Sequence, residues 1–112
     1  MQYNKLLNKK LKEKEVLVVS HRGFAGGNIV LNTISAMQNA INCGADILEL
    51  DISLSADGEF FVFHQNMEPR KLLTSKKISQ MTAAKINSLP LYNNAFKKLR
   101  LRFQLLLRCW SF

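Results

Sequence analysis

The hydrophobic pattern of the first half of the chain alternates between short continuous runs and a stretch with helical spacing. Apolar residues fill 16–19 and dominate 47–52, and both runs are rich in β-forming side chains. Between them Ile34, Met37 and Ile41 recur every three or four residues, which is typical of one face of a helix. The order therefore predicts strand, helix and strand, a βαβ unit of an α/β fold.

Both ends of the predicted helix carry recognisable signals. Asn32 or Thr33 can cap its N-terminus, and Gly44 supplies a stop after its last turn. Ala36 and Ala40 are small enough to let the helix pack closely on a neighbour. The helix thus leads from the polar loop after the first strand directly into the second strand.

A hairpin is predicted after the second strand. The Ser-Ala-Asp-Gly segment around Ala56 and Asp57 favours a turn, and 60–63 is another apolar run, which ends at His64. A turn centred between Ala56 and Asp57 would place Glu49 opposite His64. Parallel strands are the alternative, and they would place Asp51 and His64 near the carboxyl ends of the strands. The linker is too short for an ordinary helical crossover, so the hairpin is preferred.

Two acidic residues, Glu49 and Asp51, interrupt the second apolar run. On a strand, side chains two residues apart point to the same side, so these carboxylates are expected side by side. Two unpaired like charges on an apolar strand are costly, and a divalent cation such as Mg²⁺ or Ca²⁺ would offset them. The alternative is a half-exposed strand with a solvated polar face.

A polar, glycine-containing loop follows the first apolar run, which is a common setting for an α/β active site. His21 can give or take a proton near neutral pH, and Arg22 can hold a phosphate through two parallel hydrogen bonds. A capping or loop-structuring role is the alternative for this pair.

Composition limits the chain to one small domain, with 112 residues, 47% of them hydrophobic, and a formal net charge of +8. All eight acidic residues lie at or before Glu68, while ten of the sixteen basic residues follow it. Such an imbalance can serve nucleic acid or an anionic membrane. Cys43 and Cys109 have no metal-ligand or redox spacing, so we expect a reduced, cytoplasmic protein. We expect no membrane span, because no apolar run approaches the required length.

Taken in order, several short motifs resemble those of a known family. They are His21-Arg22-Gly23, Asn32-Thr33, Gly44-Ala45-Asp46, Glu49-Leu50-Asp51, Asp57-Gly58, His64 and the segment 81–89. In identity and spacing they resemble the glycerophosphodiester phosphodiesterase family, over about Val16 to Pro90. The resemblance implies a TIM-type (β/α) barrel. Because such barrels need about 250 residues, this chain would hold only the N-terminal portion of one, incomplete by itself.

The resemblance also implies a chemistry and the residues that perform it. A small-molecule glycerophosphodiester would be hydrolysed to glycerol 3-phosphate and an alcohol, assisted by a divalent cation, Mg²⁺ or Ca²⁺. By position, His21 and His64 would be the general acid/base pair, Arg22 a phosphate contact, and Glu49 and Asp51 two of the metal ligands. The family's further metal-binding carboxylate lies downstream of this chain, so we expect the 112-residue chain to be inactive alone.

The chain departs from the family pattern in three places. Val30-Leu31 stands where the family usually has Pro-Glu, and Gln65 stands where it usually has Asp. From Asn93 the sequence is basic and apolar, and codons exist for which a shifted frame at Arg102 would encode the family's Ile-Pro-Thr motif. We therefore expect a polar lead-in helix at 1–15, a partial phosphodiesterase domain at 16–92, and a frameshifted basic tail at 93–112.

The alternative function is a non-enzymatic basic module whose tail binds a membrane surface or nucleic acid. The residues that would serve it are Lys97, Lys98, Arg100, Arg102, Arg108, Trp110 and Phe112. This alternative leaves the pattern of residues 16–64 unexplained. We therefore favour the hydrolase, with no nucleic-acid partner.

Overall fold

The structure, a computed structural model, describes residues 4–95 and 97–99. Its helical segments are α1 (Lys5–Glu13), α2 (Ile34–Asn42), α3 (Glu68–Lys71), the 3-10 helix η1 (Ile78–Gln80) and α4 (Ala83–Ser88). Its strands are β1 (Val19–His21), β2 (Ile47–Glu49), β3 (Ile52–Leu54), β4 (Phe60–Val62), β5 (Leu91–Tyr92) and β6 (Lys98–Leu99). None of these described helices has the length and hydrophobicity that crossing a bilayer requires.

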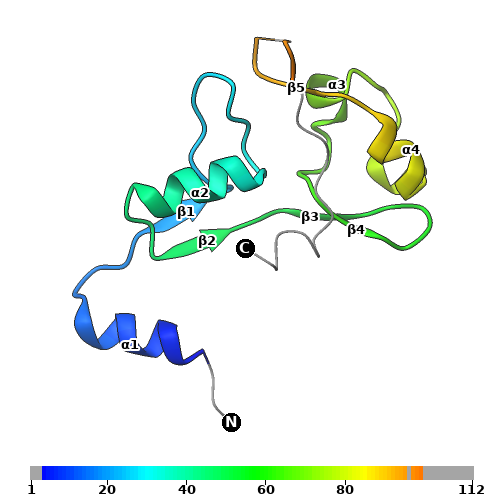
Figure 1. Ribbon diagram of the computed structural model, residues 1–112. Coiled ribbons are helices and arrows are strands. Elements are labelled where there is room, and N and C mark those ends of the chain that lie inside the picture. Colours follow the sequence, from blue (N-terminus) through cyan, green and yellow to red (C-terminus); the bar gives the residue numbers. More distant parts are fainter. Residues whose placement is uncertain (1–3, 96, 100–112) are drawn as a thin grey trace.

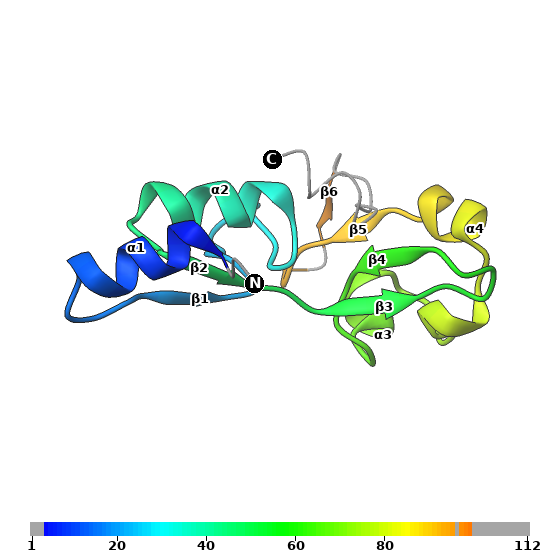
Figure 2. The same cartoon turned by 90° about the horizontal axis from the view of Figure 1, so that it is seen from below.

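The segments β1, α2 and β2 form the βαβ unit that the sequence predicts. β1 and β2 are parallel, with Val19 opposite Ile47 and His21 opposite Glu49. α2 lies along this pair of strands in both views (Figures 1 and 2). Its buried residues are Ala36, Met37 and Ala40. The carboxyl ends of both strands, and the residues that follow them, therefore lie at one edge of the sheet.

The ends of α2 follow the predicted signals. Of the two candidate caps Thr33 is the one used, and its hydroxyl accepts a hydrogen bond from the Ala36 N–H at 3.2 Å. After the last turn Gly44 adopts a left-handed φ of +96° and donates its N–H to Ile41 O at 2.9 Å. Ile41 differs from expectation, since it is 41% exposed although its spacing placed it on the apolar face.

The first apolar run forms a strand later than the sequence predicts, and that strand is not buried. β1 begins at Val19, where the run ends, and so contains His21. Val16, Val18 and Val19 are 73%, 53% and 56% exposed. Val16 and Val18 precede the strand, and within the described residues β1 pairs with β2 alone, so no second strand flanks it.

The helix α1 buries none of its residues and is held to the βαβ unit through Asp46. One oxygen of this almost fully buried carboxylate accepts from Lys10 Nζ at 2.8 Å and from Lys14 Nζ at 2.5 Å. The other accepts from the Val18 N–H at 3.1 Å. Lys10 first, then Lys14 and the Val18 N–H, hold the pKa of Asp46 well below its usual range. The sequence predicts a lead-in helix but not this contact.

The strands β3 and β4 form the antiparallel hairpin that the sequence favours over a parallel pair. Ile52 lies opposite Val62, and Leu54 lies opposite Phe60. Figure 2 shows the hairpin, with α3 and α4 around it, at the end of the molecule away from α1. The hairpin and the helices around it follow the βαβ unit along the chain.

The register of the hairpin differs from the prediction by one residue. The loop is centred on Asp57, with Gly58 at a left-handed φ of +89°, rather than between Ala56 and Asp57. A three-residue loop of this kind shifts every pair along the ladder by one position. The expected placement of Glu49 opposite His64 is therefore wrong.

The second apolar run divides into two strands. β2 ends at Glu49, β3 begins at Ile52, and Asp51 lies in the link between them. The Phe63 N–H donates to Asp51 O at 3.0 Å, so the hairpin contacts begin at this residue. Glu49 therefore belongs to the β1–β2 sheet and Asp51 to the link that leads to the β3–β4 sheet, not to one strand as the sequence predicts.

The hydrophobic core lies between the hairpin and the segment that follows it. Phe61, Ile78 and Ile86 have the largest fully buried apolar side chains. The other buried members of this cluster are Val30, Phe63, Leu72, Met81 and Leu91. The helix α4, capped by the Thr82 hydroxyl, lies within the segment 81–89 that carries part of the family resemblance. This core fixes the end of β4, which leads to the second histidine.

Candidate active site

The first histidine lies at the paired ends of β1 and β2. His21 ends β1, Glu49 ends β2, and the two stand opposite each other in the parallel register. His21 Nε2 lies 3.8 Å from Glu49 Oε2, and the two side chains are 69% and 45% exposed. The pair is open to solvent, and the Glu49 carboxylate complements the charge of His21 whenever the imidazole is protonated.

Arg22 follows in a left-handed turn that is anchored on both sides. Its φ is +61°, its N–H donates to Glu49 O at 2.9 Å, and its O accepts from the Asn32 N–H at 2.8 Å. Its Nε lies 2.7 Å from Asp51 Oδ2, with both side chains mostly buried. The buried Nε makes this contact as an ion pair, without the alignment of a hydrogen bond. Arg22 is therefore held in place by the acidic residue that follows β2.

Gly23 lets this turn lie directly against α2. It adopts a φ of +90°, and a Cβ at this position would stand 2.6 Å from the backbone carbon of Ala36. The next residue, Phe24, donates its N–H to Ala36 O at 2.8 Å. The close packing expected of Ala36 is therefore used to seat the turn that carries Arg22.

Asn32 is a site residue that the sequence analysis assigned only to capping and to the family pattern. Its Nδ2 donates to Asp51 Oδ2 at 3.0 Å, and its Oδ1 accepts from the Asp51 N–H at 3.2 Å. It is buried and holds a left-handed φ of +62°. Asn32 therefore fixes both the backbone and the carboxylate of Asp51. The sequence signal that could have identified Asn32 is its short amide side chain just before a helix cap, because asparagine tolerates a left-handed φ.

The second histidine follows β4. His64 Nδ1 lies 2.7 Å from Gln65 O. A carbonyl oxygen can only accept, so Nδ1 carries the proton, and in the neutral ring Nε2 keeps its lone pair. This contact uses the main chain of Gln65, so it does not depend on the departure from the family pattern at that position.

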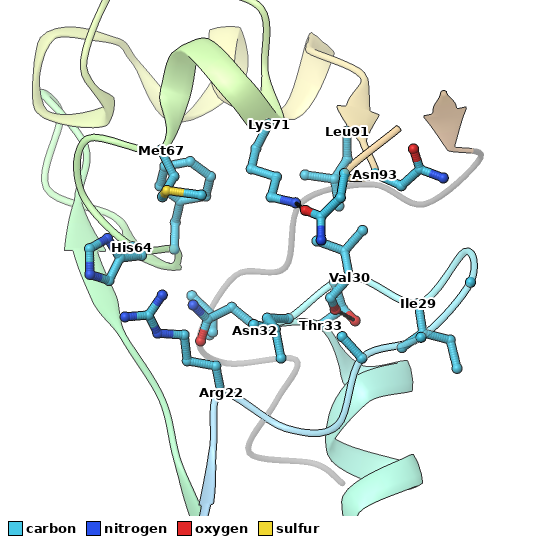
Figure 3. A pocket seen from close by; sticks show the side chains of 17 residues that line it. Arg22, Ile29, Val30, Asn32, Thr33, His64, Met67, Lys71, Leu91 and Asn93 are labelled. Atoms are coloured by element: carbon cyan, nitrogen blue, oxygen red, sulfur yellow. Dashed lines mark hydrogen bonds between the residues drawn. The ribbon is translucent and has the colours of Figure 1, made fainter. Parts of the chain in front are cut away.

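A cavity of about 380 Å³ opens beside Arg22 and His64. Figure 3 shows the Arg22 guanidinium pointing towards His64, with Asn32 next to it and with Lys71 and Asn93 across the cavity. Its apolar lining includes Ile29, Val30, Leu31, Val62, Phe63, Met67 and Leu91. A mainly apolar lining with a few polar groups is typical of a small-molecule site.

The predicted site residues thus form two contacting pairs, and two of the five residues line the cavity. Arg22 and His64 line the cavity, whereas His21, Glu49 and Asp51 do not. His21 contacts Glu49, and Arg22 joins Asp51 to the cavity wall. Convergence of His21, His64, Glu49 and Asp51 on one site, with Arg22 nearby, stays a prediction.

The fit of a divalent cation can be judged from the donor atoms. Glu49 and Asp51 supply carboxylate oxygens, which Mg²⁺ and Ca²⁺ prefer. Asp51 Oδ2, however, already accepts from Asn32 and faces Arg22. In the described part of the chain, no group of three or more His, Cys, Asp or Glu side chains is placed to hold a metal ion. The two carboxylates therefore fit as part of a coordination shell, not as a whole one.

Comparisons with known proteins agree with the sequence resemblance. The sequence model of the "Glycerophosphoryl diester phosphodiesterase family" matches residues 21–108. The human protein named "Lysophospholipase D GDPD1" is 34% identical over 110 residues, which are 97% of this chain and 33% of that protein. A "Glycerophosphodiester phosphodiesterase" from Caldanaerobacter subterraneus subsp. tengcongensis is 35% identical over 75 residues, 67% of this chain and 30% of that protein.

Solved structures show the same likeness. The crystal structure of a glycerophosphoryl diester phosphodiesterase from Parabacteroides distasonis has a TM-score of 0.74 and 22% identity, covering 85% of this chain and 33% of that one. The glycerophosphodiester phosphodiesterase of Agrobacterium tumefaciens has a TM-score of 0.66 and 30% identity, covering 80% of this chain and 39% of that one. Both likenesses are to TIM-barrel proteins, so the fold is the N-terminal portion of a TIM-type barrel.

The chain spans about a third of the length of the curated relatives it matches. The family match includes most of the basic tail, of which the structure describes only 93–95 and 97–99. The interpretation of that tail as frameshifted stays a prediction, and the alternative of a basic binding module gains no support. With 88 of its 112 residues (21–108) matched by the family model, the chain belongs to the glycerophosphoryl diester phosphodiesterase family.

Proposed function

We propose that this chain carries the first part of an active site that hydrolyses a glycerophosphodiester to glycerol 3-phosphate and an alcohol. The observation that supports this most directly is the shared cavity of Arg22 and His64, next to the strand ends that bear His21 and Glu49. Its volume, about 380 Å³, suits a small molecule of this size. This activity belongs to glycerol and lipid metabolism.

Each side chain has a role that its surroundings support. Arg22 binds the phosphate through its terminal nitrogens, because Nε is the nitrogen that faces Asp51. His21 and His64 form the general acid/base pair. One imidazole takes a proton from the attacking water, and the other gives a proton to the alcohol oxygen as its bond to phosphorus breaks. For His64 the exchanging atom is Nε2, since Nδ1 is engaged with Gln65 O.

Glu49 and Asp51 are proposed as two oxygen ligands of the divalent cation, Mg²⁺ or Ca²⁺. When bound, the cation would neutralise phosphate charge and polarise the phosphoryl group. Asp51 presents a fixed carboxylate for this, because Asn32 holds it through two hydrogen bonds. The remaining ligands would come from the rest of a family barrel, from substrate and from water.

We further propose that the 112-residue chain alone releases glycerol 3-phosphate slowly or not at all, because acid/base and metal catalysis need a finished barrel to position their groups. The measurement is glycerol 3-phosphate release by the purified chain, with and without EDTA. Robust, EDTA-sensitive release would contradict this part of the proposal and establish activity outright.

The active-site assignment is tested by completing the barrel. Residues 1–95 would be joined to the remaining two thirds of the Caldanaerobacter relative, and the chimera assayed on glycerophosphocholine. We expect EDTA-sensitive hydrolysis that falls by about 10²–10⁴-fold in His21→Gln and in His64→Gln. Asn87→Ala, an exposed change on α4, is the control and should keep the rate. A folded chimera whose activity survives both histidine changes would refute the assignment.

We propose a reducing, cytoplasmic setting as well. Cys43 is a free, exposed thiol in the described structure, which suits a compartment that keeps thiols reduced. Fractionation of cells that express the chain, with detection in the soluble cytoplasmic fraction, is the direct measurement; recovery only with membranes would contradict it.

A further inference from the structure

The two cationic side chains that line the cavity, Arg22 and Lys71, differ in the partners that they contact. Arg22 is paired with Asp51. Lys71 lies on the opposite wall (Figure 3), and no ion pair among the described residues involves it. Its Nζ donates instead to Asn94 Oδ1 at 2.5 Å. Lys71 is therefore a half-buried lysine whose ammonium group makes an exposed hydrogen bond to a neutral amide.

This arrangement leaves hydrogen-bonding and charge capacity on the cavity wall. An ammonium group has three N–H donors, and the contact with Asn94 uses one. Burial first, then the neighbouring charge of Arg70, lowers the pKa of Lys71. Loss of water without an anionic partner is unfavourable for a cation, so an anion in the cavity would be attracted to this wall.

The wall beside Lys71 is held by a network centred on Asn93. Its Oδ1 accepts from the Ala95 N–H at 3.0 Å and the Lys97 N–H at 2.9 Å. Its Nδ2 donates to Asn28 Oδ1 at 3.3 Å, which ties the wall to the loop before α2. Asn93 is buried, so these contacts hold the backbone on both sides of Asn94, whose side-chain amide contacts Lys71.

We propose that Lys71 is a specificity-determining residue, which binds an anionic group on the alcohol half of a glycerophosphodiester whose phosphate is bound by Arg22. The inference rests on the proposed function for its substrate class. It makes the cavity selective for alcohols that bear a carboxylate or a phosphate, because such a group can replace water around the ammonium. Neutral or cationic alcohols gain nothing from this wall.

Glycerophosphoserine and glycerophosphoethanolamine form a matched pair for the test, because the two diesters differ only by one carboxylate. Their affinities for the intact 112-residue chain would be measured by isothermal titration calorimetry. We expect glycerophosphoserine to bind about fivefold to tenfold more tightly, in keeping with a charged hydrogen bond that is partly exposed. Lys71→Gln should bring the two affinities together.

Two control variants separate this role from others. Arg70→Gln removes the same charge from the adjacent, exposed residue and should keep the preference. Arg22→Gln should weaken both diesters and glycerol 3-phosphate to a similar extent, because all three present a phosphate. Circular dichroism of Lys71→Gln checks that the variant folds.

Several outcomes would overturn the proposal. They are equal affinities for the two diesters in the unmodified chain, a preference that survives Lys71→Gln, or no binding of any diester. Loss of glycerol 3-phosphate affinity in Lys71→Gln would also overturn it, since Lys71 would then hold the phosphate itself. The test needs no hydrolysis. If the chimera is active but the chain does not prefer glycerophosphoserine, only this inference is refuted. If the chain prefers glycerophosphoserine but the chimera is inactive, only the proposed function is refuted.

Discussion

Replacing Gly23 by alanine tests the close approach of the Arg22 turn to α2. Gly23 has a φ of +90°, which L-residues rarely adopt. The added Cβ would lie 2.6 Å from the carbon, 2.7 Å from the Cβ and 2.8 Å from the oxygen of Ala36. Two of these atoms belong to the backbone of α2, so a rotamer change cannot relieve the contact. The turn or the helix must move.

The expected loss in the free energy of unfolding has two parts, one from the backbone conformation and one from the close contact. A left-handed backbone at a residue with a Cβ costs about 1–2 kcal/mol. Forcing an extra carbon into a packed contact costs about 1–3 kcal/mol more. Gly23→Ala should therefore lower the free energy of unfolding by about 2–5 kcal/mol, a large share of the stability of a small domain.

Two other glycines provide matched controls. Gly44 has a similar φ of +96° but no atom within 4 Å of a built Cβ, so Gly44→Ala should cost only the backbone part, about 1–2 kcal/mol. Gly26 has neither a left-handed φ nor a close neighbour, and Gly26→Ala should change stability by less than about 1 kcal/mol. Urea unfolding followed by far-ultraviolet circular dichroism gives all three values. A Gly23→Ala variant no less stable than Gly44→Ala would refute the contact.

Three further changes test the supports of the site. Asn32→Ala removes both hydrogen bonds to Asp51 and should cost about 1–3 kcal/mol in urea unfolding; an unchanged midpoint would mean that Asp51 needs no support. Asp46 has a lowered pKa in the fold, so its hold on α1 should be complete above about pH 4 and weaken as the pH falls below that value. Hydrogen exchange of the α1 amides should show this loss on acidification, and Asp46→Asn should show fast exchange already at neutral pH. Thr33→Ala removes the N-terminal cap of α2 and should lower the free energy of unfolding by about 1 kcal/mol in urea unfolding. An unchanged value would mean that the Thr33 hydroxyl is dispensable.

The parts of the fold that sequence predicts well are those encoded by neighbouring residues. The cap at Thr33, the stop at Gly44 and the periodicity between them define α2 to within a residue or two. The hairpin follows from a turn segment between two apolar runs. In each case the interaction that decides the structure spans only a few residues, so its signal is complete in a short window.

The parts that sequence predicts poorly depend on contacts between distant residues. The hairpin register is set by the three-residue loop with Gly58 in the left-handed region. Composition alone does not distinguish this loop from a two-residue turn centred between Ala56 and Asp57. The contact of Lys10 and Lys14 with Asp46 joins positions more than thirty residues apart. Lys71 reaches the cavity because the core beneath the hairpin orients α3. A lysine in such a segment resembles any solvated lysine until the fold is known.

Asp51 is the point at which the two units of the site meet. Its N–H donates to Asn32 Oδ1, from the loop before α2, and its O accepts from the Phe63 N–H, from the end of β4. Its carboxylate at the same time holds Arg22. His21 ends β1 of the βαβ unit and His64 follows β4 of the hairpin, so Asp51, between β2 and β3, lies in the segment that joins the two units. Because the strand break at Leu50 and Asp51 leaves both backbone groups of Asp51 in contact with the two units, the departure from a single continuous strand connects the βαβ unit to the hairpin.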